Sequence, residues 1–182
     1  MPFDHFGLIA PIYARAQYHA IEKMREVAAL PARGRLLDVG GGTGRVASAL
    51  RHLVDEVVIT DISMGMLRQA PRSTLEPAGC ASEFLPFPND SFERVILVDA
   101  LHHVLDQAAT AGEMLRVLKP GGLLVIEEPN SRTFGVKLIA LAEKLLMMRS
   151  HFLSPDRIRS LFPSSNARII TEDASVWIVV EK

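Results

Sequence analysis

The chain has 182 residues and a mass of 20.0 kDa, which fits one compact domain and leaves no room for two of ordinary size. Hydrophobic residues make up 48% and charged residues 23%, a globular composition that excludes a wholly disordered chain. Twenty Lys and Arg against 21 Asp and Glu give a net charge of −1, which provides no overall attraction to nucleic acid or an anionic membrane.

Helices and strands are predicted to alternate along the chain. The first half is predicted to contain, in order, the helix 12–30, the strand 35–39, the helix 45–53, the strand 57–60, the helix 64–70 and a strand within 75–80. The second half is predicted to contain the loop 85–90, the strand 95–98, the helix 107–118, the turn 119–122, the strand 123–126, the helix 134–148, a short helix from 155, and the strands 169–170 and 176–180. Ser63, Asp106 and Ser154 are the predicted helix caps.

This alternation predicts the fold class. Strands that read as continuous apolar runs, separated by helices, are typical of a mostly parallel sheet covered on both faces. The last two strands lack a helix-length connection, so we expect an antiparallel hairpin at the sheet edge. The fold class is therefore α/β, with a doubly wound, mostly parallel seven-stranded sheet and a C-terminal antiparallel hairpin.

A glycine-rich loop is the strongest signal of a binding site. Asp38 lies in the first predicted strand, and Gly40-Gly41-Gly42-Thr43-Gly44 connects that strand to the next helix. Ligands of doubly wound sheets bind at this carboxyl edge, where glycines allow close approach of the backbone. Asp61 ends the second strand about 20 residues further on, where a carboxylate can accept hydrogen bonds from both ribose hydroxyls.

Two ligand classes compete for this loop. The dinucleotide fingerprint is Gly-x-Gly-x-x-Gly, but Arg45 stands where its third glycine would fall. Asp38 would repel a pyrophosphate and attract a ligand that carries an ammonium and a sulfonium. The charges therefore favour S-adenosylmethionine as the cofactor over a nicotinamide dinucleotide. No metal site is predicted.

Five segments in chain order carry a family resemblance. They are residues 36–44, 61–67, 85–92, 99–104 and 113–122, which read LLDVGGGTG, DISMGML, LPFPNDSF, DALHHV and EMLRVLKPGG. They resemble motifs of the class I S-adenosylmethionine-dependent methyltransferases, methyltransferase type 11 subgroup, which includes ubiquinone/menaquinone-type methyltransferases. The resemblance covers residues 35–128 in register. It implies a Rossmann-like methyltransferase fold and methyltransferase activity.

The resemblance also implies contacts to the cofactor. Asp38 and the glycines should lie along the methionine moiety and the ribose; those glycines are Gly40, Gly41, Gly42 and Gly44. Asp61 should hold the ribose hydroxyls, and Ile62 should pack on the adenine. Asp99, at the tip of the fourth strand, should orient the methionine ammonium.

The adenine edge is where this chain departs from the family pattern. The loop that contains Ser82 and Glu83 should meet this edge. The family usually carries an Asp at the position that Ala81 occupies here. Glu83 or backbone groups are therefore expected to replace the usual carboxylate contact with the adenine amino group.

Acceptor-side residues follow from their position near the strand tips. Methyl transfer requires the acceptor to be aligned with the methyl group, and a general base can add about 10²–10⁴-fold. His103 is the predicted catalytic residue because a neutral imidazole can accept a proton near pH 7, with a packing or capping role as the alternative. One of Glu127 and Glu128 is expected to face the pocket. The candidates for the substrate pocket are Tyr13, Tyr18, His102 and Glu128.

One methyltransferase domain is expected over residues 1–182. Its parts are a helical cap at 1–30, the cofactor-binding core at 31–128, acceptor-side helices at 129–162 and the hairpin at 163–182. The helix 134–148 is predicted to be a core helix or a cap over an apolar acceptor. The expected partner is a small-molecule acceptor, with a quinone-like ring or a lipid as the apolar option.

The same residues also bear on other functions and on where the protein acts. A non-catalytic domain that binds S-adenosylmethionine or S-adenosylhomocysteine is the alternative, and a nucleic-acid or protein methyltransferase is less favoured. The element after the fourth strand, Asp99-Ala100-Leu101-His102, lacks the Pro-Pro-aromatic motif of base methyltransferases, so no nucleic-acid partner is expected.

A lone cysteine, Cys80, favours a cytoplasmic location. No apolar run of about 20 residues is present, so no stable membrane insertion is expected. The oligomeric state is left open.

Overall fold

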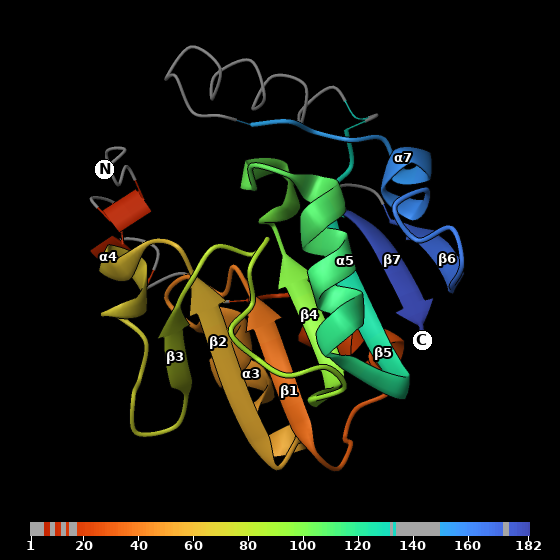
Figure 1. Ribbon diagram of the computed structural model, residues 1–182. Helices are drawn as coiled ribbons and strands as arrows, with labels where there is room; N and C mark the ends of the chain where they lie inside the picture. The colour runs from red at the N-terminus through yellow and green to blue at the C-terminus, as the bar shows by residue number, and fades with distance from the viewer. Residues whose placement is uncertain are drawn as a thin grey trace.

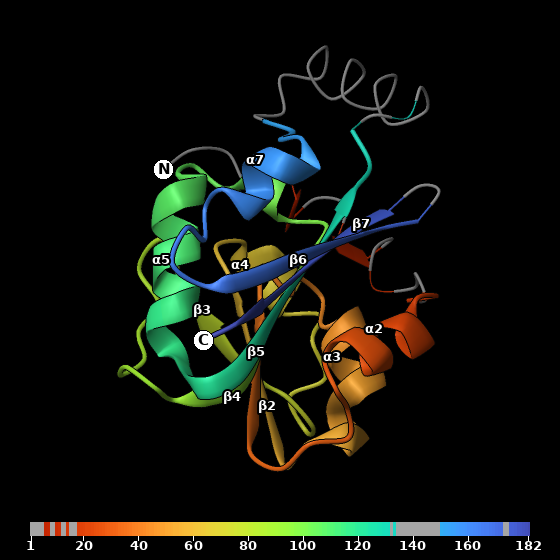
Figure 2. The same cartoon turned by 90° about the vertical axis from the view of Figure 1, so that its right-hand side faces the viewer.

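A seven-stranded sheet forms the centre of the molecule. The computed structural model describes residues 6–7, 10–11, 14, 18–131, 133, 150–172 and 175–182. The strand order is β3-β2-β1-β4-β5-β7-β6 (Figure 1). Helices α2 (Ile21–Val27) and α3 (Arg45–Leu50) cover one face, and α5 (Gln107–Val117) covers the other (Figure 2). The predicted fold class is confirmed.

The pairing of the strands gathers their ends at one edge. The first five strands are β1 (Arg35–Val39), β2 (Glu56–Asp61), β3 (Glu76–Gly79), β4 (Phe92–Val98) and β5 (Leu118–Pro129), and each pairs in parallel with its neighbours among them. Strand β7 (Ser175–Glu181) lies between β5 and β6 (Asn166–Thr171) and is antiparallel to both. The carboxyl ends of β2, β1, β4 and β5 therefore lie side by side.

The short helices begin where the sequence places their caps. Other helices that lie wholly within the described residues are η1 (Arg51–Leu53), α4 (Met64–Leu67), η2 (Leu101–His103) and α7 (Pro155–Arg159). Ser63 accepts a hydrogen bond from the Met66 amide at 3.1 Å, and Asp106 accepts from two amides at the start of α5. Ser154 precedes α7 but makes no side-chain capping bond. No helix in the described ranges is long and apolar enough to cross a membrane.

The first predicted helix was too long. Residues 18–20 are not helical, and α2 covers only Ile21–Val27. The helix ends in a Schellman motif: Ala29 adopts a φ of +48°, its amide donates to the Glu26 carbonyl at 3.2 Å, and the Leu30 amide donates to the Arg25 carbonyl at 2.8 Å. The Arg94 guanidinium, 65 positions beyond Ala29, also binds the carbonyls of Ala28 and Ala29 at 2.6 and 3.3 Å.

Three other boundaries also differ from prediction. The helix 45–53 is an α-helix only to Leu50 and then tightens into η1, and the helix 64–70 ends at Leu67. The predicted turn 119–122 lies inside β5, because the Gly121 amide donates to the Lys182 carbonyl and the Lys182 amide donates to Gly122. The predicted helix 134–148 lies outside the described residues.

The sheet is buried on both faces, and neighbouring residues serve different cores. Leu36 and Val125 belong to the core beneath α2 and α3, whereas Leu37 and Ile126 belong to the core beneath α5. This division follows from the alternation of side chains along a strand. The same alternation determines on which face of the sheet the side chain of each residue at a strand end lies.

A substitution at Gly44, the last glycine of the loop, tests how tightly the loop packs against Leu75. Its φ is +76°, and an added Cβ would lie 2.6 Å from Leu75 Cδ1. We expect Gly44→Ala to lower the free energy of unfolding by about 2–3 kcal/mol, because a left-handed conformation costs an L residue about 1–2 kcal/mol and overpacking adds to this. Urea denaturation measures the effect.

Gly112 in α5 is the matched control, because nothing lies within 4 Å of a Cβ added there. Gly112→Ala should leave stability unchanged or raise it by up to about 1 kcal/mol. Equal effects of the two substitutions would contradict the strain assigned to Gly44.

Candidate cofactor and acceptor site

The glycine loop packs tightly against the tip of β4. Gly40 has a φ of +68°, and a Cβ there would lie 2.8 Å from the Ala100 Cβ. The loop is held in place by hydrogen bonds from the Gly41 amide to the Thr60 carbonyl and from the Gly44 amide to the Gly41 carbonyl. Gly40, Gly41 and Gly42 are half-buried, and because they carry no side chain a ligand can approach their backbone closely.

Asp61 at the end of β2 is held in position by the backbone. Its Oδ2 accepts from the Gly42 amide at 3.0 Å, and its Oδ1 accepts from the Ser63 amide at 2.7 Å. Each carboxylate oxygen has two lone pairs, so this carboxylate can also accept from a pair of hydroxyls. Ile62 follows it with 74% of its side chain exposed, an apolar surface beside a site for a sugar.

Asp38 is a buried carboxylate beneath the loop. It is only 1% exposed, and its Oδ2 has no hydrogen-bond partner among the described residues. Burial raises the pKa of Asp38 to about 7, while Arg45 opposes this rise and Asp61 adds to it. An unpaired buried carboxylate is costly unless a positive group meets it, so this position suits a cationic ligand.

Glu127 connects the tip of β5 to the segment before α2. The Tyr18 hydroxyl donates to Glu127 Oε2 at 2.6 Å, and the Ser175 hydroxyl lies 3.4 Å from Oε1. Burial raises the pKa of Glu127, and repulsion from Asp99 adds to it. Asp99 adopts a φ of +55° and donates its amide to the Glu127 carbonyl at 2.9 Å, so the two acids are neighbours.

Glu128 and His102 form a buried pair on the other face of β5. The two residues are 4% and 2% exposed, and His102 Nδ1 lies 2.6 Å from Glu128 Oε2. Glu128 Oε1 also accepts from the Ala100 and Leu101 amides at 3.0 and 2.8 Å. Both residues were predicted to line the substrate pocket; in the structure they bind each other and hold η2 to β5.

His103, the predicted base, is partly buried among rings. Its ring centre lies 4.9 Å from that of Phe6 and 4.0 Å from that of His102, and its Nδ1 is 3.3 Å from the Ser150 hydroxyl. Burial, with a contribution from His102, lowers the pKa of His103 to about 4. The imidazole is therefore neutral at physiological pH and is a weaker base than a free histidine.

Glu83 and Ser82 are the residues expected to border the adenine. Glu83 Oε1 accepts hydrogen bonds from the Leu105 and Asp106 amides at 2.8 and 2.9 Å, so this oxygen joins two loops. Ser82 lies half-buried in the turn after β3. Tyr13 lies outside the described residues.

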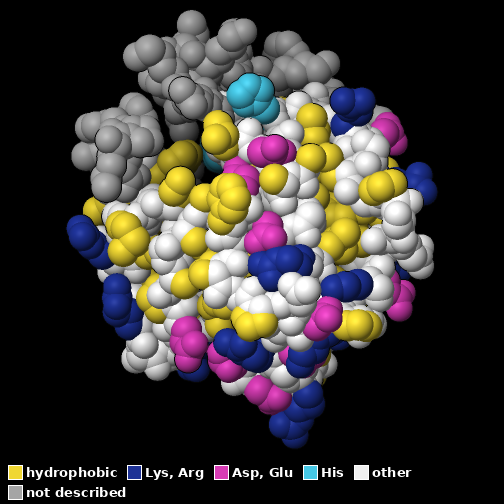
Figure 3. Space-filling model, viewed as in Figure 1, with side chains coloured by type: hydrophobic (Ala, Val, Ile, Leu, Met, Phe, Trp, Pro, Cys, Tyr) yellow, Lys and Arg dark blue, Asp and Glu magenta, His cyan; other side chains and the backbone are white. Residues whose placement is uncertain are grey.

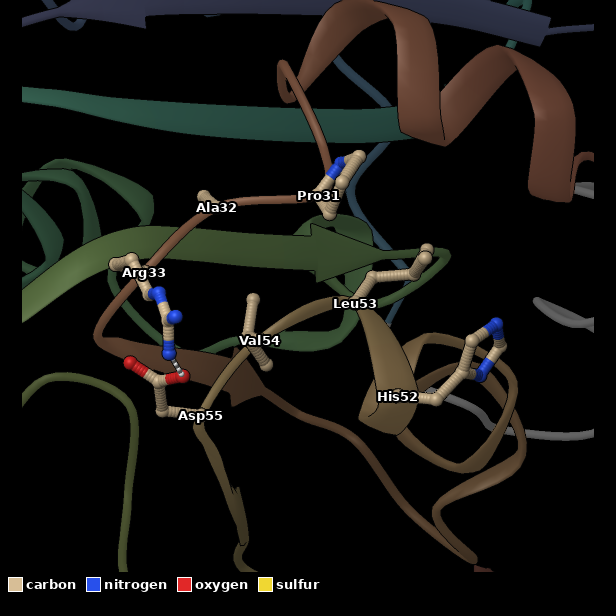
Figure 4. A pocket seen from close by; sticks show the side chains of 7 residues that line it. All are labelled: Pro31, Ala32, Arg33, His52, Leu53, Val54 and Asp55. Carbon is tan, nitrogen blue, oxygen red and sulfur yellow. Dashed lines mark hydrogen bonds and ion pairs between the residues drawn. The ribbon is translucent and has the colours of Figure 1, made fainter.

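A surface hollow of about 300 Å³ lies away from this site. Figure 4 shows its lining, in which Arg33 and Asp55 form an ion pair at 3.2 Å. The lining residues precede β1 or β2, so the hollow lies at the amino ends of these strands, opposite the glycine loop. They are Pro31, Ala32, Arg33, His52, Leu53, Val54 and Asp55.

The sheet order, the glycine loop after β1 and the acid after β2 define the Rossmann-like fold of the S-adenosylmethionine-dependent methyltransferases. A family model described as "Methyltransferase domain" matches residues 13–174. The chain belongs to this methyltransferase family, which confirms the resemblance seen in the sequence.

Relatives and a solved structure agree with this assignment. Two curated relatives are named ubiquinone/menaquinone biosynthesis C-methyltransferase UbiE. The one from Geobacter sulfurreducens is 42% identical over 117 residues, 56% of this chain and 45% of that protein. The one from Coxiella burnetii is 40% identical over 105 residues, 52% of this chain and 42% of that protein. The chain thus matches less than half the length of these relatives.

The YcgJ protein of Bacillus subtilis shares the fold, with a TM-score of 0.75 and 24% identity, over 84% of this chain and 70% of that one.

Proposed function

We propose that this chain transfers a methyl group from S-adenosylmethionine to a small-molecule acceptor. The observation that supports this most strongly is the pairing of two acids around the glycine loop. Asp61 presents a carboxylate suited to ribose hydroxyls, and Asp38 presents a buried, unpaired oxygen suited to a cation. When bound, S-adenosylmethionine supplies an electrophilic methyl group on a sulfonium. The residues present fit this group.

The proposed cofactor contacts follow the edge of the sheet. Asp61 holds the ribose, Ile62 covers the adenine, and Asp38 and Asp99 face the positively charged methionine end. Ser82 borders the adenine, while Glu83 shapes this border by fixing the Leu105–Asp106 backbone. The glycines that let the cofactor approach are Gly40, Gly41, Gly42 and Gly44.

The acceptor is proposed to lie beyond β4, beside η2. His103 is neutral there and can accept a proton, and its lowered pKa suits an acceptor with an acidic proton. The names of the relatives support a finer proposal, carbon methylation of a quinone-like ring. In the face shown in Figure 3, basic side chains are interspersed with acidic ones, which gives this face no continuous surface for a polyanion.

Ligand binding tests the cofactor proposal. S-adenosylmethionine and S-adenosylhomocysteine at about 100 times their dissociation constants should stabilise the protein by about 2.7 kcal/mol, and NADH should not. Asp61→Ala should weaken S-adenosylmethionine binding about 100-fold, because two hydrogen bonds to a charged acceptor are lost. Thermal-shift assays and calorimetry measure both.

Two results would contradict the proposal. One is stabilisation by NADH alone. The other is cofactor binding with no S-adenosylhomocysteine formed from a panel of hydroquinones, phenols and amines, which would favour the non-catalytic binding domain. Glu56→Gln, at the opposite edge of the sheet, is the control for Asp61→Ala and should leave cofactor affinity unchanged.

A further inference from the structure

Arg45 is the first residue of α3 and directly follows the glycine loop. Its guanidinium carbon lies 5.8 Å from the centre of the Tyr18 ring, and the Tyr18 hydroxyl donates to Glu127 near the end of β5. The Arg45 side chain thus leaves the helix toward the carboxyl edge of the sheet, where the glycine loop lies. It is half-buried there, so one side of it remains open to a ligand.

Asp38 and Arg45 are opposite charges at the two ends of the glycine loop, yet they form no ion pair. Arg45 lowers the pKa of Asp38 against the effect of burial, and it also lowers that of Glu127, so it lies within electrostatic range of both acids. Within the part of the chain that the structure describes, Arg45 takes part in no ion pair, and the buried Oδ2 of Asp38 has no hydrogen-bond partner. A buried charge without a partner is costly, so a ligand group is needed at Asp38.

The zwitterionic end of an α-amino acid satisfies both side chains at once, because it carries an ammonium and a carboxylate on one carbon. The ammonium suits the Asp38 carboxylate. The carboxylate suits the Arg45 guanidinium, whose planar fork of N–H donors can bind both of its oxygens. A pyrophosphate would be repelled by Asp38, and a simple amine would leave Arg45 without a partner. The charges on the two sides of the loop therefore favour an amino acid group over either of these.

We propose that Arg45 is a specificity-determining residue that binds the carboxylate of the ligand's α-amino acid end, while Asp38 faces its ammonium. This inference rests on the proposed function, in which the ligand is S-adenosylmethionine. The site then discriminates against an adenosyl sulfonium that lacks the carboxylate. The alternative is that Arg45 only packs on Tyr18 and holds the segment before α2, and it predicts no effect on ligand preference.

Calorimetry with S-adenosylmethionine and decarboxylated S-adenosylmethionine distinguishes these roles, because the two probes differ only in the carboxylate. The wild type should bind S-adenosylmethionine about tenfold or more tightly than the decarboxylated probe, as expected for charge-assisted hydrogen bonds. Arg45→Gln and Arg45→Met should each reduce this preference to about twofold or less, while affinity for the decarboxylated probe changes little. Arg45→Lys should retain a preference of about threefold, because an ammonium attracts the carboxylate but lacks the bidentate fork.

Two further variants serve as controls. Arg51→Gln removes the same charge from an exposed residue at the other end of α3, and it should leave both affinities unchanged. Asp38→Asn should weaken the binding of both probes together, since both carry the ammonium, and should therefore preserve the ratio of their affinities.

Equal affinity of the wild type for the two probes would overturn the inference, whether or not the variants fold. An unchanged preference in Arg45→Gln or Arg45→Met, with circular dichroism showing a folded protein, would overturn it as well. Failure of the wild type to bind either probe would instead overturn the proposed function.

Discussion

Replacing Glu128 by alanine is expected to lower the free energy of unfolding by about 3–5 kcal/mol, a large share of the stability of a domain of this size. Two buried donors, the Leu101 amide and the His102 ring, and the partly buried Ala100 amide would lose their acceptor together. The cost of a buried donor without an acceptor exceeds that of a lost surface bond. Urea denaturation followed by circular dichroism measures the change.

Glu56 provides the comparison for Glu128. It also accepts two hydrogen bonds, both from the Arg35 guanidinium, but the two side chains are 38% and 37% exposed. Glu56→Gln should therefore cost less than about 1 kcal/mol. If Glu128→Ala were equally mild, water or a rearranged backbone would have to satisfy the donors, and the structural role of the pair would be refuted.

Asp38→Asn should stabilise the ligand-free protein at pH 8 while abolishing tight cofactor binding. Folding raises the pKa of Asp38 from 3.8 to about 7. The unfolded state releases this proton near pH 4 and the folded state retains it until about pH 7, so the wild type loses stability as pH rises through that window. The full penalty is on the order of 4 kcal/mol. An unpaired amide in the variant offsets part of it, which leaves a net gain of about 1–3 kcal/mol.

The pH dependence separates this effect from a general improvement in packing. The gain in the free energy of unfolding should be present at pH 8 and turn into a loss of about 1–3 kcal/mol at pH 4, where both side chains are neutral and only the cost of the unpaired amide remains. S-adenosylmethionine affinity should fall at least tenfold in the same variant, because the buried negative charge is gone. A gain of the same size at both pH values, or retained affinity, would refute the assigned role of Asp38.

Periodicity and turn chemistry were enough to predict the sheet. The strands β1, β2, β4 and β5 contain runs of apolar residues, which are a local signal. The edge strand β3, Glu76-Pro77-Ala78-Gly79, lacks such a run, and its signal in the sequence was correspondingly weak. The glycine loop and Asp61 were also predictable, since a parallel sheet brings the ends of its strands to one edge. The caps Ser63 and Asp106 act on amides within three residues, so local sequence again sufficed.

Long-range contacts determine what could not be predicted. The carbonyls of Ala28 and Ala29, just after α2, are bound by Arg94, which is distant in sequence. The roles of Glu127 and Glu128 depend on which core each face of β5 meets. Alternation shows that these neighbours point in opposite directions, but not that Tyr18 lies on one side and His102 on the other. The sequence alone therefore could not tell which of these two neighbours would bind Tyr18 and which would bind His102.

The register of the antiparallel strands has a practical consequence for spectroscopy. Trp177, the single tryptophan of the chain, lies directly across from Glu127 in the β5–β7 pair, and residues so paired project from the same face. The indole is fully buried in the core that contains Tyr18. Its emission will therefore report the local field near Glu127 as well as the integrity of the sheet. An intrinsic fluorophore thus stands beside Glu127 at the carboxyl edge of the sheet, and no label is needed to follow changes there.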